Sequence, residues 1–238
     1  ERHAEVSFES PSLIEGLPGH GMVASIAVDQ ITDQLGLKHH VSIHSRDLPT
    51  VTTFAAGRVR DLVRVYAGEN VLTLQSDIPI PAEAHDALGA CILDDLTDSF
   101  DRAIFLAGVP AKGEDDHGIV SGVATTDDVE RELLEADIEL MDGTGILGGI
   151  TGALAQRCYR QDLPAAILLV RANPYFPDPA AARSLIETAL EPLVDFDIDT
   201  SDLQEQAAEI RTQKQQIAAQ LKEQQESQTS APQGRSMF

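Results

Sequence analysis

Two short segments of the chain, residues 103–107 and 165–170, are apolar at every position. Each lies beside a segment whose apolar residues recur at helical spacing. A strand that is apolar on both faces has to be covered on both faces, which is typical of a central strand in a parallel sheet. Strands that alternate with helices then predict a three-layer α/β sandwich with a mostly parallel sheet.

The rest of the chain supplies the other elements of this sandwich. Strands are predicted over residues 5–8, 12–15, 39–44, 51–56, 59–66, 71–74, 119–125 and 138–141. Helices are predicted over residues 23–35, 84–100 and 127–136, in a segment that stops before Pro164, and around residues 185–193. A four-residue connection at 67–70 joins two of the strands as a hairpin, so we expect a mixed sheet.

The composition changes after residue 195. Leu203, Ile210 and Ile217 recur every seven residues, a spacing typical of a coiled-coil-like amphipathic helix. From residue 224 onward Gln, Ser, Pro and Gly dominate, which indicates disorder. The sequence therefore predicts an α/β domain over residues 1–197, a helix over 198–224 and a flexible tail over 225–238.

The charge of the chain is strongly negative, with 39 Asp and Glu against 17 Lys and Arg, or −22 in total. Such a field repels nucleic-acid phosphates and anionic lipids, so we expect no nucleic-acid or membrane partner. The carboxylates are spread along the chain, as expected for a halophilic protein in a salt-rich cytosol. With no signal peptide and no apolar run near 20 residues, the sequence predicts a soluble cytoplasmic protein.

Two glycine-rich turns each lie between a predicted strand and a predicted helix. The first contains Gly16, Gly19 and Gly21, but Met22 and Val23 stand where a phosphate-binding P-loop needs Lys and Ser or Thr. The second contains Gly143, Gly145 and Gly148. Two helix N-termini at the carboxyl edge of one sheet would form an anion-receptive crevice. The other interpretation is that the glycines permit tight turns and close packing.

The histidines do not form a compact ligand set along the sequence. His39, His40 and His44 lie on one predicted strand, where alternation places His40 and His44 on one face and His39 on the other. Zinc sites need several convergent Cys or His ligands, so we predict no metal site. The acidic segment 114–117 is interpreted as a solvated loop. Ser25, Ser121 and Cys91 each lack an identifiable base, so we predict no catalytic residue. We also predict no cofactor.

Several segments together resemble one family. Residues 16–24, with the sequence Gly-Leu-Pro-Gly-His-Gly-Met-Val-Ala, and later segments at 106–110, 143–152 and 177–181 are similar, in order, to landmarks of the PAC2 family. This is the proteasome assembly chaperone 2 group. The resemblance implies a phosphorylase-like sandwich that forms homo-oligomers, and the acidic composition fits a haloarchaeal member.

The resemblance also implies a function, namely non-enzymatic binding of 20S proteasome α-subunits through the C-terminal tail. Tails of archaeal relatives resemble a hydrophobic residue, a tyrosine and any last residue. The aromatic ring fills a cleft while the carboxylate meets a lysine. Here Met237 matches the hydrophobic residue, whereas Phe238 replaces the tyrosine and ends the sequence. The chain is trimmed, docks differently, or does not dock by its tail. The alternative is an enzyme or sensor that binds a small anionic metabolite or nucleotide at the two glycine turns.

Overall fold

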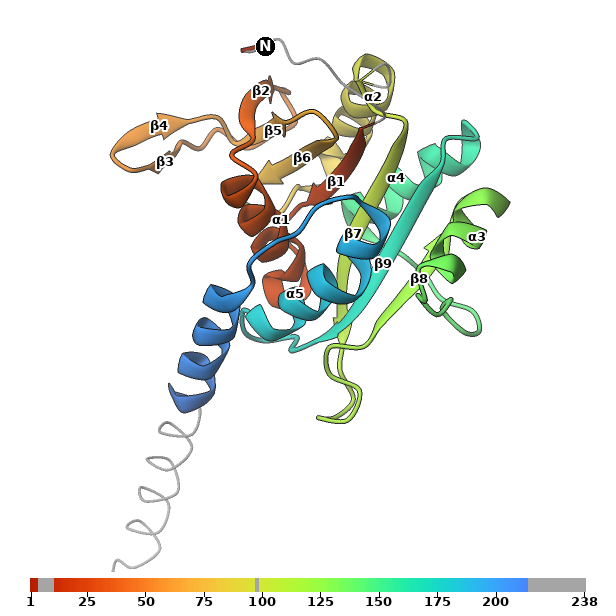
Figure 1. The fold of residues 1–238 in the computed structure, drawn as a ribbon. Coiled ribbons are helices and arrows are strands. Elements are labelled where there is room, and N and C mark those ends of the chain that lie inside the picture. The colour runs from red at the N-terminus through yellow and green to blue at the C-terminus, as the bar shows by residue number, and fades with distance from the viewer. Residues whose placement is uncertain (4–10, 97–98, 214–238) are drawn as a thin grey trace, which may run out of the picture.

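The computed structural model describes residues 1–3, 11–96 and 99–213 (Figure 1). A seven-stranded sheet with the order β2-β5-β6-β1-β7-β9-β8 forms its middle layer. The strands are β1 (Ser12–Gly16), β2 (Lys38–Ile43), β5 (Val63–Ala67), β6 (Val71–Ser76), β7 (Arg102–Pro110), β8 (Val120–Ala124) and β9 (Ala165–Ala172). The helices are α1 (Val23–Gln34), α2 (His85–Asp95), α3 (Asp127–Glu135), α4 (Gly149–Arg160) and α5 (Pro179–Leu185), which continues through η4 (Ile186–Leu190) and α6 (Glu191–Leu193).

The strand directions confirm the predicted mixed sheet. The central strands β6, β1, β7 and β9 are mutually parallel. Strand β5 pairs antiparallel with both β2 and β6, and β8 pairs antiparallel with β9. The carboxyl ends of the four central strands therefore lie at one edge of the sheet, where the connections from β1, β6 and β9 to the following helices begin.

Two hydrophobic cores, one on each face of the sheet, confirm the three layers. Helices α1, α3 and α5 cover one face, and α2 and α4 cover the other. Along β7, Ile104 and Leu106 enter the first core, whereas Ala103 and Phe105 enter the second. Strand β9 alternates in the same way. The two fully apolar segments are thus central strands buried on both faces, as the sequence predicts.

Local chemistry explains where two of the helices begin. The Thr126 hydroxyl accepts a hydrogen bond of 3.3 Å from the Val129 N–H and so caps α3, whose first turn is acidic. Asp178 caps α5 through a 3.1 Å bond from the Ala181 N–H, with Pro179 in the first turn. Side-chain acceptors at the cap and negative charge in the first turn both stabilise a helix N-terminus.

The segment predicted as two strands over residues 51–56 and 59–66 folds differently. A separate hairpin of β3 (Thr53–Ala55) and β4 (Arg58–Arg60) precedes β5. Ala56 and Gly57 both have positive φ, +49° and +77°, the backbone that a two-residue hairpin loop requires. The prediction of one strand over 59–66 was therefore wrong, because this loop closes a second hairpin that ends at Arg60.

Three further predictions differ from the structure or lie outside it. The helix predicted over 84–100 ends at Asp95. In the segment 138–141, Leu140 forms an isolated bridge to Gly122 where a strand was predicted. The strand predicted over 5–8 lies outside the described residues. In the described part of the chain, no helix has the length and apolar character needed to cross a membrane.

Candidate functional site

The first glycine turn is packed tightly at the carboxyl end of β1. A Cβ atom added to Gly16 would lie 2.4 Å from the Cβ of Val28 in α1. One added to Gly108 in β7 would lie 2.2 Å from the His20 carbonyl oxygen, so the turn crosses directly over β7. Gly21 has a φ of +62°, and its carbonyl accepts a 2.8 Å bond from the Asp178 N–H. Close packing therefore accounts for Gly16 and Gly21.

The second glycine turn faces solvent. Among the described residues, no atom lies within 4 Å of a Cβ added at Gly143, Gly145 or Gly148. Gly143 has a φ of +80°, which sets the direction of the turn. Between these glycines the Ile146 side chain is 97% exposed. The turn thus presents an apolar side chain that the rest of the described chain does not cover.

Glu15 connects the two turns at the sheet edge. Its carboxyl group is fully buried and accepts a 2.9 Å bond from the Leu17 N–H of the first turn. The other oxygen accepts a 3.2 Å bond from the Thr151 hydroxyl, in the first turn of α4. Burial raises the pKa of Glu15 to about 7. The Glu15 side chain thereby fills the space between the first turn and α4 that an anion would need, so this geometry disfavours an anionic ligand.

A groove of about 710 Å³ lies between two loops and the C-terminal helix. Its walls are residues 111–117, residues 173–180 and one side of the helix over 201–213. Inside it, the His117 Nε2 lies 2.7 Å from the Asp178 Oδ2. That same oxygen accepts a 2.7 Å bond from the Asn173 N–H, so Asp178 fixes the loop, the cap of α5 and the imidazole together.

The helix over residues 201–213 is attached to the body at its start and then points away from it (Figure 1). The Gln30 and Gln34 side chains of α1 bind the backbone of Asp199, at 2.8 Å to its carbonyl and 2.9 Å to its N–H. Leu203 is 2% exposed and belongs to the first core. Ile210, one heptad later, lines the groove. The first part of the predicted seam thus packs on the protein's own body. Ile217, Met237 and Phe238 lie outside the described residues.

The β3–β4 hairpin carries a second exposed apolar surface. It forms its own two-stranded sheet and projects from the β2 edge of the molecule (Figure 1). Phe54 and Val59 face each other across it and are each 76% exposed. At its base Arg60 pairs with Asp77, which also holds the Arg64 guanidinium at 2.8 and 3.0 Å. A two-stranded hairpin has little stability of its own.

The histidines of β2 are arranged differently from the prediction. The register with β5 shifts between His39 and Val41, which inserts one extra residue into β2. Because this bulge reverses the alternation, His39 shares a face with Ser42 and His44. Ser42 Oγ lies 3.0 Å from His39 Nε2, and His44 Nε2 lies 3.7 Å from Asp61 Oδ1. The prediction that His39 points away from His44 was therefore wrong.

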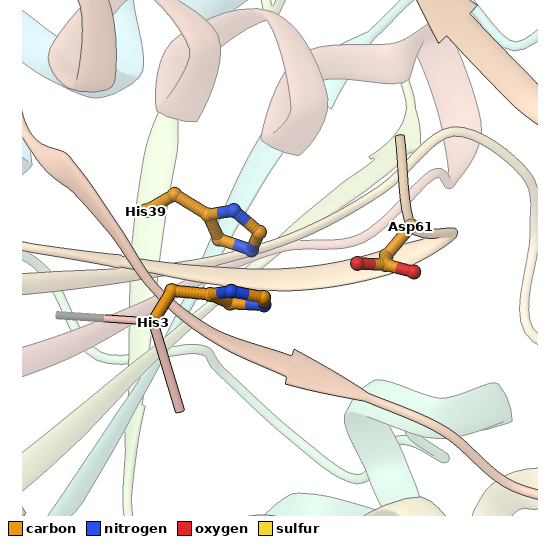
Figure 2. A group of neighbouring side chains, drawn as sticks. All are labelled: His3, His39 and Asp61. Carbon is orange, nitrogen blue, oxygen red and sulfur yellow. The ribbon is translucent and has the colours of Figure 1, made fainter. Parts of the chain in front are cut away.

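His3 joins this group from the start of the chain, a contact that strand periodicity does not reveal (Figure 2). Desolvation and the neighbouring His3 lower the pKa of His39. The hydrogen bond from the Ser42 hydroxyl lowers the pKa of Asp61. The cluster therefore combines a carboxylate that stays ionised with an imidazole that stays neutral to lower pH than usual.

The sandwich, its C-terminal helix and its two exposed apolar surfaces define an α/β protein suited to contact with other proteins, and the described residues do not form a recognisable catalytic constellation. The chain belongs to the PAC2 family, whose model matches residues 13–218. This match confirms the resemblance seen in the sequence motifs.

Comparisons with individual proteins agree with this assignment. The chain is 28% identical over 217 residues to an uncharacterized protein of Methanocaldococcus jannaschii, which covers 91% of this chain and 89% of that protein. The fold of the present chain is similar to that of PbaA of Pyrococcus furiosus, which is described as an archaeal homolog of proteasome-assembly chaperone. The TM-score is 0.82 at 24% identity, and the match covers 94% of this chain and 93% of PbaA. PbaB of the same organism, described as an archaeal proteasome activator, matches with a TM-score of 0.80, 19% identity and coverage of 92% and 97%.

Proposed function

We propose that this protein is a non-enzymatic, proteasome assembly chaperone-like protein that binds α-subunits of the 20S proteasome. Membership of the PAC2 family supports the proposal, as do the folds shared with PbaA and PbaB. The observation that carries it is the helix over 201–213, anchored to α1 at Asp199 and directed away from the sandwich. The helix thus leads away from the body at residue 213, the last described residue.

The contact with the proteasome is assigned to Met237 and Phe238 at the end of the tail. An aromatic side chain of this kind fills an apolar cleft between subunits. The body is proposed to form a homo-oligomer in the cytoplasm of a salt-adapted archaeon. We assign one self-contact to the β3–β4 hairpin, since Phe54 and Val59 are large apolar residues that the described chain leaves exposed.

Pull-down with the 20S core particle and with isolated α-subunits tests the function. The full chain is compared with a chain that lacks its last three residues and with Phe238→Ala. We expect the truncation to weaken binding by at least about tenfold, a typical loss for a buried aromatic anchor. Equal binding of all three forms would reassign the contact to the body. Absence of binding by the full chain would remove the proposed function.

Self-association is tested separately by sedimentation velocity on Phe54→Ser/Val59→Ser. A matched control is Tyr159→Ser, which removes another exposed large side chain on α4. We expect the hairpin variant to sediment as a smaller species and the control to behave as the parent. An unchanged oligomer in the hairpin variant would place the self-contact elsewhere.

The alternative function, binding of a small anionic metabolite or nucleotide at the glycine turns, is less well supported. The buried carboxyl of Glu15 fills the space between the first turn and the first turn of α4. A thermal-shift screen with phosphate, nucleotides and acyl phosphates checks this conclusion, because a ligand of the native state raises the melting temperature. A clear shift that Glu15→Gln strengthens would revive the alternative.

A further inference from the structure

Three potential metal ligands converge at the β2 edge of the sheet, as Figure 2 shows. His3, His39 and Asp61 each offer a ligand atom, and these atoms lie within 4.8 Å of one another. The two imidazole rings stack with their centroids 4.3 Å apart, and the Asp61 carboxylate lies to the side of the stack. The residues come from three separate segments of the chain, so the group is created by the fold.

Backbone pairing holds the three segments in place. Residues 1–3 run antiparallel to β2, with a 2.7 Å bond from the His3 N–H to the His40 carbonyl and a bridge between Arg2 and Val41. The bulge in β2 turns His39 toward the same face. Asp61 lies between β4 and β5, directly after the base of the hairpin. Two of the three ligands are thus held by pairing with or within β2, which limits the freedom they lose when an ion binds.

We propose that His3, His39 and Asp61 bind a divalent transition-metal ion of the zinc type. Two imidazole nitrogens and one carboxylate oxygen are ligands that zinc accepts at about 2.0–2.2 Å, with a fourth position left for water. Magnesium and calcium prefer all-oxygen sites, so the imidazoles select against them. His3 is exposed and the other two side chains are half-buried, which leaves room for the small rotations that bring the ligand atoms around one ion.

Positive charges near the cluster are partly offset by partners. The Glu1 amino group donates a 2.8 Å bond to the Ser42 carbonyl. The Arg64 guanidinium on β5 is paired with Asp77 at 2.8 and 3.0 Å. His44 Nε2 lies 3.7 Å from Asp61 Oδ1, the carboxylate oxygen that does not accept the Ser42 bond. The net charge of −22 also raises the local concentration of cations around the whole molecule.

The Ser42 hydroxyl provides the competing explanation for the cluster. Its oxygen lies 2.6 Å from Asp61 Oδ2, 2.8 Å from His3 Nε2 and 3.0 Å from His39 Nε2. It donates one hydrogen bond to the carboxylate and accepts one from each imidazole, which uses its full capacity. An imidazole nitrogen that binds the metal has to give up its proton and this bond. In the first explanation each imidazole Nε2 binds the metal without a proton, and in the second each Nε2 carries a proton and donates it to Ser42. An experiment can therefore separate the two explanations.

The test uses the full-length, untagged protein, stripped of metal with a chelator. Zinc is titrated by calorimetry and cobalt by visible absorption, both in millimolar magnesium so that oxygen-only sites are already occupied. We expect one zinc ion per chain. His39→Ala and Asp61→Asn should each lower the affinity at least about tenfold, the loss that even outer-shell partners of a metal produce. The control is His20→Ala, which removes an exposed histidine outside the cluster.

Two further variants keep the outcome clear. His3→Gln changes an exposed residue and leaves the two cores untouched, so a loss of zinc affinity there reports on the site itself. Ser42→Ala removes the hydrogen-bond centre but no proposed ligand, and it should retain zinc. The proposal would be overturned if zinc did not bind in the presence of magnesium. It would also be overturned if the His3, His39 and Asp61 variants bound zinc as tightly as the parent protein. The assay contains no proteasome, so its result is independent of the proposed function.

Discussion

The two glycine turns look alike in sequence but have opposite surroundings in the structure. In the first, Gly16 and Gly21 lie against α1 and the segment at 172–173, where an added Cβ would meet atoms at 2.4 and 3.0 Å. In the second, the positions of Gly143 and Gly145 are open, and Ile146 between the flanking glycines is exposed. The same residue type therefore serves close packing at one turn and backbone direction at the other.

This difference separates the turns by what they contribute. The first turn fixes α1 against β7, so we expect substitutions there to change the stability of the fold. The second turn stands in solvent, so we expect side-chain substitutions there to leave stability almost unchanged and to affect contacts with other molecules, whereas a side chain added at Gly143 strains the backbone. Glu15 connects the two, because Leu17 of the first turn and Thr151 of α4 both donate to its carboxyl group.

The largest effect is expected for Gly16→Ala. The added methyl group would lie 2.4 Å from the Val28 Cβ, which is attached to the α1 backbone and cannot rotate away. Overpacking of this kind costs about 3 kcal/mol of the free energy of unfolding. Urea unfolding measures the loss. Gly19→Ala is the matched control, since no described atom lies within 4 Å of its added Cβ, and it should stay within about 0.5 kcal/mol of the parent. Similar losses in both variants would contradict the packing role.

The next effect is the change of protein stability with pH that the buried Glu15 carboxyl causes. Its pKa is raised from 4.5 to about 7 in the folded protein, so the folded state holds the proton more tightly than the unfolded chain. The stability from this group is fully present below pH 4.5 and is lost as the pH rises through about 7. Between pH 5 and 8 the loss is about 2–3 kcal/mol.

Glu15→Gln isolates this contribution. The other carboxylates titrate equally in both proteins, so the difference between them reports on Glu15 alone. We expect the variant to gain about 2–3 kcal/mol relative to the parent on going from pH 5 to pH 8, measured by urea unfolding at constant ionic strength. A difference that does not change with pH would mean that the folded-state pKa of Glu15 is close to its ordinary value.

The contrast between the turns also shows what periodicity can and cannot predict. The uninterrupted apolar runs identify β7 and β9, because burial on both faces removes polar residues from a strand. The bulge in β2 leaves no such trace. It depends on pairing with β5, and one extra residue moves His39 to the face of Ser42. The family motifs identified the PAC2 fold, whereas the cluster with His3 depends on contacts between distant segments.

The C-terminal helix illustrates the same limit. The heptad spacing of Leu203 and Ile210 predicts an apolar seam, and the structure has that seam. Spacing does not identify the surface that covers it. Leu203 enters the body's own core because the Asp199 backbone is bound by Gln30 and Gln34, more than 160 residues earlier in the chain. A contact over this separation cannot be inferred from a local pattern.

A smaller effect separates backbone strain from packing. Gly21 and Gly143 both have positive φ, but a Cβ added to Gly21 meets the Asn173 carbonyl at 3.0 Å whereas one added to Gly143 meets open space. Gly143→Ala should therefore cost about 1 kcal/mol for the left-handed backbone alone. Gly21→Ala should cost about 2 kcal/mol, since the contact adds to the strain. Thermal unfolding of the two variants measures the difference, and equal losses would mean that the contact relaxes at no cost.

The smallest effect on stability is expected for Ile146→Ser in the second turn. The side chain is 97% exposed, so its removal takes away no burial within the chain, and the change should stay within about 0.5 kcal/mol. Melting at two protein concentrations tests this, because a turn covered by a second copy would make the variant's loss depend on concentration. If the variant melts at the parent's temperature at both concentrations, Ile146 is exposed in solution and accessible to a partner. A loss above about 1 kcal/mol would show that this turn, like the first, is buried in the molecule's working state.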